Sequence, residues 1–225
     1  MKGSAGMNLI GIRKPQIYTP IKEIVLESSK KFESTIDGFL EISPFPEYSI
    51  YKAVKSEEPK FTKSANTCAI LGMSNGKQTY LGHYAPELKS QKFKKQLEYD
   101  VKKMQDETGE LSAIITGGYD KDLQDGVNSV KKQQITASFT QLAEIGEVLD
   151  KAGANLTMVA AKTNPSFKEN LAVTPDRFIL SFTPNTIASK YPDITKCKNN
   201  AEIEQELSKF YSISELDSFH NIHKG

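Results

Sequence analysis

The chain of 225 residues is long enough for one large domain or two small ones with a substantial core. Its 29 basic and 28 acidic side chains leave a formal net charge of +1, so the sequence shows no broad basic footprint for a nucleic acid. No stretch approaches the roughly 20 apolar residues of a membrane-spanning helix, and the N-terminus lacks the apolar run of a signal peptide. We therefore expect a cytoplasmic protein that does not insert into a membrane.

The chain contains two cysteines, Cys68 and Cys197. They are far apart in the sequence and fit neither a zinc-binding spacing nor a disulfide framework. A bridge between them is expected only if the protein is exported, because disulfides persist in oxidising compartments.

Residues 1–6 are small and polar, and residues 7–17 have mixed character. Residues 23–31 are compatible with a short strand or a short helix. Residues 36–51 carry two prolines and several aromatic side chains, a composition typical of an irregular segment or an edge strand. A polar break follows at residues 56–60.

A β-hairpin is predicted in the next part of the chain. The Asn-Gly pair at residues 75–76 tolerates the positive φ angles of a two-residue type I′ turn. Such a turn pairs Lys77 with Ser74. Continuing the same register places His83 opposite Cys68, with the two side chains sharing one edge of the sheet.

Two main helices and one shorter helix are predicted from apolar residues at helical spacing. The main helices cover residues 90–106 and 128–152, and the short one covers residues 200–211. Ser90 is a suitable N-cap for the first helix, and Gly153 is a suitable residue just beyond the second.

The remaining strands are short and bounded by turn residues. Residues 111–116 form an apolar strand that runs into a glycine pair at 117–118, which marks a bend or a close approach by other backbone. Residues 155–162 form another strand. Residues 171–182 form a second hairpin around a turn at 174–176 with proline at its second position.

These elements predict an α+β fold in which helices cover a mostly β core. We expect one domain at residues 61–188. An N-terminal extension, residues 1–60, precedes it, and a C-terminal helical extension and tail, residues 189–225, follow it.

Cys68 and His83 are the candidate catalytic pair. A thiol becomes a nucleophile when a neighbouring base takes its proton, and the base needs a third group to fix its tautomer. Thr62, or Ser64 as a substitute, can hydrogen-bond the imidazole. Backbone N–H groups around Thr67 and Cys68 can stabilise an oxyanion.

Each of these residues also has a purely structural interpretation. A cysteine at position 68 fits a small buried hydrophobe in a strand. His83 fits a surface or turn histidine, and the glycine pair fits a plain turn.

The order of elements over residues 62–183 resembles the chemoreceptor glutamine deamidase family, CheD. It is also similar to the catalytic domains of the cytotoxic necrotizing factor deamidase toxins, which share that fold. In the CheD pattern a threonine stands six residues before the cysteine, and a histidine follows after a hairpin. Thr62, Cys68 and His83 keep this pattern. The segments AIITGGY, NLTMVAA and LAVTPDRFILSF follow in the family's order.

The sequence departs from the family pattern in three places. Asn66 and Thr67 stand where the family usually has Gly-Ser before the cysteine. Gly82 alone remains of the glycines before the histidine. Residues 1–60 and the tail from about residue 189 are not part of the compact chemotaxis enzyme.

The resemblance implies a CheD-like layered β core with two main helices packed against it. It also implies a chemotaxis-related, cysteine-dependent hydrolase that deamidates glutamine to glutamate on a protein substrate, through Cys68, His83 and Thr62. No metal or organic cofactor is implied. Substrate specificity would lie in surrounding loops, including Tyr119 and Tyr84.

Two other functions remain open at this stage. One is a non-catalytic binding module on the same scaffold, which would be favoured if the cysteine and histidine side chains pointed to opposite faces of the sheet. The other is a transglutaminase or thiol hydrolase, which would use the same dyad with a different acyl acceptor or scissile bond.

Overall fold

The computed structural model describes residues 24–43, 51–86, 91–105, 110–119, 129–159, 161–162 and 167–184, together with residues 202, 205, 211 and 212. The helices are α1 (Ser29–Thr35), α2 (Gln91–Gln105) and α3 (Ser129–Lys151). The strands, in chain order, are β1 (Ile24–Glu27), β2 (Leu40–Glu41), β3 (Tyr51–Ser56), β4 (Lys60–Ala65), β5 (Ala69–Ser74), β6 (Thr79–Tyr84), β7 (Ser112–Gly117), β8 (Asn155–Val159), β9 (Ala161–Lys162), β10 (Phe167–Val173), β11 (Phe178–Pro184) and β12 (Tyr211–Ser212).

The described strands form two mixed five-stranded sheets. Sheet A has the strand order β1-β11-β10-β4-β2, and sheet B has the order β3-β6-β5-β7-β8. β9 and β12 pair separately as a two-stranded ladder. The predicted α+β fold, with two main helices packed against a β core, is therefore confirmed.

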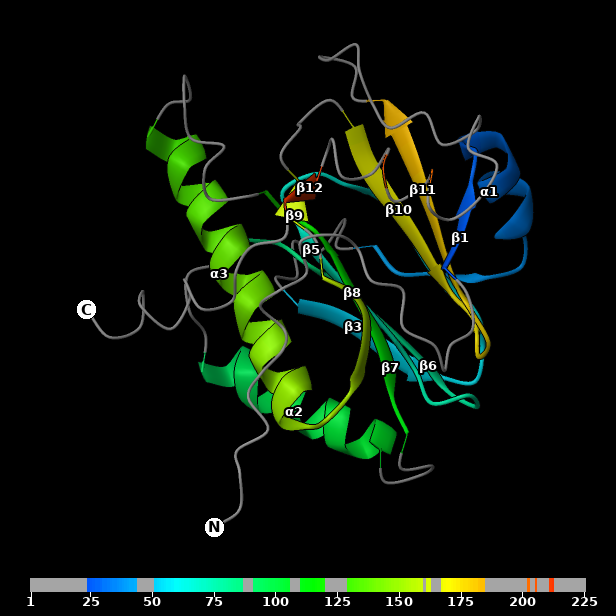
Figure 1. Cartoon of the computed structure of the whole chain (residues 1–225), viewed down its shortest axis with the longest axis horizontal. Helices are drawn as coiled ribbons and strands as arrows, with labels where there is room; N and C mark the ends of the chain where they lie inside the picture. Colours follow the sequence, from blue (N-terminus) through cyan, green and yellow to red (C-terminus); the bar gives the residue numbers. More distant parts are fainter. Residues whose placement is uncertain are drawn as a thin grey trace.

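The helices and sheets are stacked in layers (Figure 1). Sheets A and B pack face to face through a shared apolar cluster. α2 and α3 cover the outer face of sheet B, and α1 covers the outer face of sheet A. Each sheet thus has one face toward the other sheet and one face toward helices.

The core between the sheets is aliphatic and aromatic. Its buried members are Ile24, Ile42, Ala65, Ile70, Leu81, Ile114, Phe167, Leu171, Val173, Phe178, Leu180 and Phe182. Gly72 in β5 permits the close packing of these side chains. A Cβ at Gly72 would lie only 2.8 Å from Val173 Cγ2 and 2.9 Å from Ile114 Cγ2. The missing side chain therefore lets sheet A approach sheet B closely at this point.

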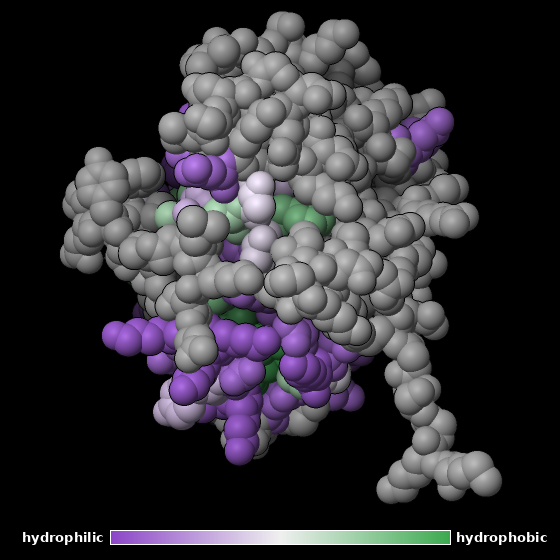
Figure 2. Space-filling view, turned by 90° about the vertical axis from the view of Figure 1, so that its left-hand side faces the viewer, coloured by the Kyte–Doolittle hydropathy of each residue, from purple (hydrophilic) through white to green (hydrophobic). Residues whose placement is uncertain are grey.

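α2 is amphipathic in the way its sequence predicts. Phe93, Leu97, Val101 and Met104 are all buried in the cluster between sheet B and the helices. Figure 2 views the helix side of the molecule and shows hydrophilic side chains gathered in the lower part, where α2 lies. The helix therefore shields sheet B with one face and meets solvent with the other.

α3 ends with the glycine cap that its sequence predicts. Gly153 has a φ of 68°, and its N–H donates to the Asp150 carbonyl at 2.8 Å. The Ala154 N–H donates to the Leu149 carbonyl at 3.0 Å, which satisfies a carbonyl of the last turn. The N-cap predicted for α2 at Ser90 lies outside the described residues.

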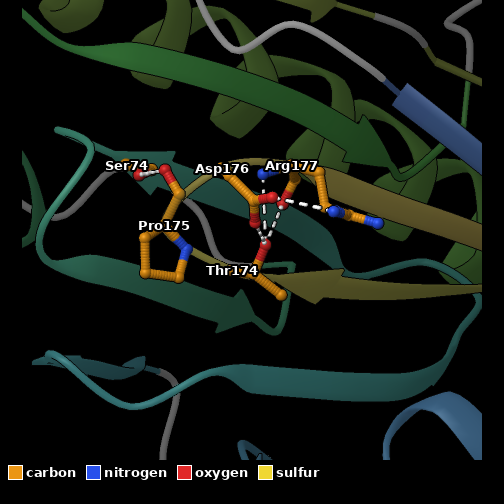
Figure 3. Close-up of polar contacts among 5 residues, drawn as sticks. All are labelled: Ser74, Thr174, Pro175, Asp176 and Arg177. Carbon is orange, nitrogen blue, oxygen red and sulfur yellow. Dashed lines mark hydrogen bonds and ion pairs between the residues drawn. The ribbon is translucent and has the colours of Figure 1, made fainter.

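The second predicted hairpin is present as β10 and β11. In its turn, Thr174 Oγ1 donates to Asp176 Oδ1 at 2.6 Å, and the Arg177 N–H donates to Thr174 Oγ1 at 3.1 Å (Figure 3). Ser74 Oγ, at the end of β5, donates to the Pro175 carbonyl at 2.8 Å. This bond ties the turn of sheet A to sheet B.

The turn of the β5–β6 hairpin has four residues, so the predicted two-residue turn is wrong. Thr79, not Lys77, pairs with Ser74. The Asn75 side chain organises the longer turn, because its Oδ1 accepts hydrogen bonds from the N–H groups of Lys77 at 3.1 Å and Gln78 at 2.7 Å. An asparagine side chain that mimics backbone in this way favours a wider turn than the Asn-Gly pair alone predicts.

The longer turn changes the predicted register by two residues. His83 pairs with Ile70 rather than with Cys68. The sequence predicts that the first strand of the hairpin begins at Cys68 and that the second ends at His83. In the structure β5 begins one residue later, at Ala69, and β6 ends one residue later, at Tyr84. Cys68 therefore lies just before β5, on the approach to the strand.

Part of the predicted N-terminal extension belongs to the sheets. β1 pairs in parallel with β11, β2 pairs in parallel with β4, and β3 pairs antiparallel with β6. Residues 23–31, which fitted a strand or a helix, contain both: β1 is followed by α1, whose N-cap Ser28 accepts a hydrogen bond from the Lys31 N–H. The boundary drawn at residue 60 falls inside the sheets, because strands on both sides of it complete the same ladders.

The predicted C-terminal helix at residues 200–211 lies almost entirely outside the described residues. At its expected end, Tyr211 is in β12, where it pairs with Lys162 of β9.

Candidate active site

A buried hydrogen bond joins Thr62 and His83 across the two sheets. Thr62 lies in β4 of sheet A, and His83 lies in β6 of sheet B. Thr62 Oγ1 is 2.6 Å from His83 Nδ1, and the two residues are 0% and 2% exposed. The structure thus brings together two of the three predicted site residues.

Strand register explains why these two side chains meet. Thr62 pairs with Leu171, and His83 pairs with Ile70. Directly paired residues share a face of their sheet, and both Leu171 and Ile70 belong to the cluster between the sheets. Thr62 and His83 therefore point into the same inter-sheet layer from opposite sides.

Burial controls the charge of His83. Desolvation lowers the pKa of its imidazole from 6.5 to about 4, so the ring is neutral at pH 7. A neutral imidazole carries one ring proton. In the tautomer with the proton on Nδ1, that N–H donates to Thr62 Oγ1 and Nε2 keeps its lone pair. Such a ring can accept a proton through Nε2.

Cys68 points into the layer that holds His83. Cys68 is a free cysteine that is half-buried and packs against the inter-sheet cluster. Cys68 precedes Ile70 by two residues, and Ile70 pairs with His83. Because Cys68 packs against the cluster that contains Ile70, the thiol and the imidazole border the same layer between the sheets. Cys197 lies outside the described residues.

This placement bears on the alternatives for both residues. Cys68 packs against the cluster between the sheets, and His83 pairs with Ile70 of that cluster, so the opposite-face arrangement that would favour a binding module is not observed. His83 is a buried strand residue rather than a surface or turn histidine.

The glycine pair after β7 holds the Cys68 backbone. The Gly118 N–H donates to the Cys68 carbonyl at 2.8 Å. Gly117 and Gly118 have φ angles of 87° and 62°, and a Cβ at Gly117 would lie 2.3 Å from the Cys68 oxygen. The close backbone approach predicted for this pair is therefore confirmed, and only glycine permits it.

Ser64 does not take the role of substitute partner for the imidazole. Its side chain is exposed, and its backbone has a φ of 60°. The Ser64 N–H donates to Asn170 Oδ1 at 2.9 Å, at an irregularity in the β4–β10 ladder between Glu169 and Leu171. This left-handed residue and its bulge turn the chain from β4 toward Cys68.

Two further polar residues beside Cys68 form a side-chain pair. Tyr119 Oη donates to Asn66 Oδ1. Asn66 is half-buried and precedes Cys68 by two residues, and Tyr119 follows the glycine pair that holds the Cys68 carbonyl. The sequence marked Asn66 only as a departure from the CheD pattern, and that departure was the available signal.

A buried carboxylate lies next to this pair. Glu169 in β10 is 0% exposed and accepts a hydrogen bond from Thr116 Oγ1 at 2.9 Å. Burial, and then the nearby Glu169 charge, raise the pKa of Tyr119 to about 12. The sequence carries no clear signal for Glu169, because its neighbours Lys168 and Asn170 are polar as well.

Tyr84 lies on the wrong side of sheet B for a specificity loop. It is fully buried in the cluster under the helices, where its ring packs edge-on against Phe93. Tyr84 Oη and Tyr80 Oη are 2.8 Å apart. The expectation that Tyr84 contributes to a substrate loop is therefore wrong, because adjacent strand residues face opposite sides.

Among the described residues, no three His, Cys, Asp or Glu side chains are grouped closely enough to hold a metal ion. None of the described helices combines the length and apolar character needed to cross a membrane. The chain matches no protein-family model, and no curated protein is significantly similar to it.

Proposed function

We propose that this protein is a cysteine-dependent protein-glutamine deamidase, a hydrolase that converts a glutamine side chain to glutamate and releases ammonia. The observation that carries the proposal is the 2.6 Å contact of His83 with Thr62, in a buried layer that also contains the Cys68 thiol. A neutral, oriented imidazole on the same face as a thiol has the parts of an activated nucleophile.

The first half of the reaction is acyl transfer to sulfur. His83 Nε2 takes the thiol proton while Cys68 Sγ attacks the carboxamide carbon. The resulting tetrahedral intermediate carries a negative oxygen. Its C–N bond then breaks as the imidazolium returns the proton to nitrogen, and ammonia leaves.

The second half is hydrolysis of the thioester. His83 takes a proton from water, the hydroxide oxygen attacks the acyl carbon, and the C–S bond breaks. The imidazolium returns the proton taken from water to sulfur, and the carboxylic acid product ionises to a carboxylate by releasing its own proton to solvent. Because the pKa of the buried imidazole is about 4, the ring is neutral between the steps and carries the extra proton only during each transfer.

Thr62 acts as the positioning residue. By accepting a hydrogen bond from the Nδ1–H group, it favours the tautomer whose Nε2 is a base. The chemistry requires no metal or organic cofactor. The resemblance to the CheD family makes glutamine-bearing chemoreceptors the first protein substrates to test.

The test is mass spectrometry of candidate substrate proteins after incubation with the full chain. We expect a gain of about one dalton at particular glutamines, as amide hydrolysis requires, together with ammonia release. Cys68→Ala is the matched control and should abolish both signals while its circular dichroism stays that of the wild type. Deamidation that persists in Cys68→Ala would end the proposal.

Two further measurements distinguish a deamidase from a transglutaminase and from a non-catalytic binding protein. Adding methylamine beside water distinguishes a transglutaminase, which would leave an N-methyl amide instead of an acid. Alkylation of Cys68 at pH 7 should be slower in His83→Ala than in the wild type, because the neutral imidazole accepts the thiol proton. The same rate in both proteins would identify an inert thiol and a binding protein.

A further inference from the structure

Asn66 and Cys68 form hydrogen bonds with two consecutive residues, Tyr119 and Gly118, which directly follow β7. The Cys68 carbonyl accepts from the Gly118 N–H at 2.8 Å, and Asn66 Oδ1 accepts from Tyr119 Oη. The two contacts fix both ends of the bend at residues 66–68. Asn66 is thus held beside the candidate nucleophile by a bond of its own.

The bond to Tyr119 also determines what Asn66 can offer. An amide side chain has one acceptor oxygen and two N–H donors. The oxygen is occupied by the Tyr119 hydroxyl, so the amide cannot turn over without losing that bond. Among the described residues this is the only hydrogen bond of the Asn66 side chain, and the residue is half-buried. Its NH₂ group is therefore a fixed donor at the site.

Tyr119 is a reliable anchor for this arrangement. It is 1% exposed, and the positive φ angles of Gly117 and Gly118 turn it back toward Asn66. Because burial and Glu169 raise the pKa of Tyr119 to about 12, its hydroxyl remains a donor throughout the neutral pH range.

We propose that the Asn66 side-chain amide donates a hydrogen bond to the oxyanion that forms when Cys68 attacks a carbonyl carbon. The inference deepens the proposed function and rests on Cys68 being its nucleophile. It assigns a catalytic role to Asn66 and a positioning role to Tyr119. A side-chain donor here would supplement the backbone N–H groups of residues 67 and 68.

The proposal can be tested without the natural substrate by comparing two reactions of the same thiol. With p-nitrophenyl acetate, Sγ forms a bond to the carbonyl carbon, the ester oxygen leaves as p-nitrophenolate, and the reaction passes through an oxyanion. With iodoacetamide, Sγ displaces iodide from a saturated carbon, and no oxyanion forms. An oxyanion donor should therefore accelerate only the first reaction.

We expect Asn66→Ala to slow acylation of the full chain by p-nitrophenyl acetate about 100-fold, as for loss of one oxyanion donor. Alkylation by iodoacetamide should stay within about twofold, because thiolate formation does not need the donor. Asn66→Asp, which keeps an acceptor but lacks the NH₂ group, should lose at least as much acylation rate.

Tyr119→Phe tests the anchor. It should slow acylation about tenfold by releasing the amide, whereas Tyr99→Phe, at an exposed position of α2, should have no effect. In the double variant Tyr119→Phe with Asn66→Ala, the rate should equal that of Asn66→Ala alone, since the anchor acts only through Asn66.

The outcomes separate this inference from the proposed function. If Cys68→Ala is acylated as fast as the wild type, the nucleophile itself is wrong. If the wild-type thiol reacts in both assays and Asn66→Ala leaves acylation unchanged, only the role of Asn66 is wrong. An equal fall of both rates in Asn66→Ala would mean that Asn66 merely shapes the Cys68 segment, and would also overturn the inference.

Discussion

The two ends of the packed sheets differ in how many hydrogen-bond partners their buried polar side chains have. At the turn end, which comprises residues 56–60, 74–79 and 174–177, four buried polar side chains have several partners each, namely Lys60, Ser74, Asn75 and Thr79, whereas Gln78 Oε1 is buried without one among the described residues. Lys60 Nζ contacts four oxygens, from Ser56, Glu58 and Thr79, at 2.7–3.2 Å. Asn75 uses its oxygen twice within the turn, and its NH₂ group donates to the Met104 carbonyl at 2.8 Å.

At the site end, around Cys68, His83 and Asn66, the donors and acceptors are used sparingly. Within the described part of the chain, His83 has one hydrogen bond, to Thr62, and the Asn66 side chain has one, to Tyr119. A polar group that serves only stability is saturated, since unmade buried bonds are costly. A group that acts on a substrate must keep one donor or acceptor for it.

Removing a saturated group should produce the largest effect, and that effect should be on stability. We expect Lys60→Met to lower the free energy of unfolding by about 3 kcal/mol, because the buried Thr79 Oγ1 and the partly buried oxygens of Ser56 and Glu58 lose the ammonium group that they contact. Urea unfolding followed by circular dichroism measures the change. Lys77→Met, at an exposed position whose ion pair with Glu57 is also exposed, should change it by less than about 0.5 kcal/mol.

The acylation rate of folded Lys60→Met should remain near that of the wild type. If Lys60→Met slowed acylation as much as a substitution at the site end, the distinction between the two ends would be wrong.

At the site end, the effect should appear in reactivity instead. We expect His83→Gln to slow acylation of Cys68 by p-nitrophenyl acetate about 100-fold, equivalent to about 2.7 kcal/mol of activation free energy, because the general base is lost. The free energy of unfolding at pH 7 should change by at most about 1 kcal/mol, since glutamine can still bond Thr62. Stopped-flow kinetics and urea unfolding on one preparation compare the two quantities, and a larger loss of stability than of reactivity would contradict the assignment.

The smallest expected effect is a pH dependence of stability from His83. Its pKa is about 4 in the folded chain and 6.5 in the unfolded chain. Between these pH values the imidazole is protonated in the unfolded state but not in the folded state. The stabilisation that neutral His83 gives the folded state is therefore complete above pH 6.5 and declines as the pH falls toward 4. At pH 5 the loss should be about 2 kcal/mol.

His83→Gln supplies the reference for this measurement because it carries no titrating ring. The difference between the wild-type and His83→Gln unfolding free energies should change by that amount between pH 7 and pH 5. A flat difference would mean that the imidazole is hydrated in the folded protein.

The sequence contained enough information for the layers and for part of the site. Short apolar runs bounded by turn residues, and helical spacing within α2 and α3, depend on neighbours in the chain, so they could be read directly. The six-residue separation of Thr62 and Cys68, together with the CheD resemblance, pointed to the threonine that contacts His83.

What the sequence missed depended on side-chain contacts between distant segments. The hairpin register was wrong because the Asn75 side chain, anchored to the end of α2, widened the turn. Glu169 could not be placed near Tyr119 without knowing that β10 packs over β7. Strands from residues 24–56 were assigned outside the domain because their partners, β11, β4 and β6, follow later in the chain.

The Thr62–His83 contact spans two layers whose spacing depends on the bare backbone of Gly72. Slight swelling of this sandwich would separate oxygen from ring nitrogen while every ladder within each sheet stayed intact. Mild heating or a low denaturant concentration should therefore abolish the reactivity of Cys68 before any strand or helix unfolds. Inactivation should thus precede the loss of secondary structure.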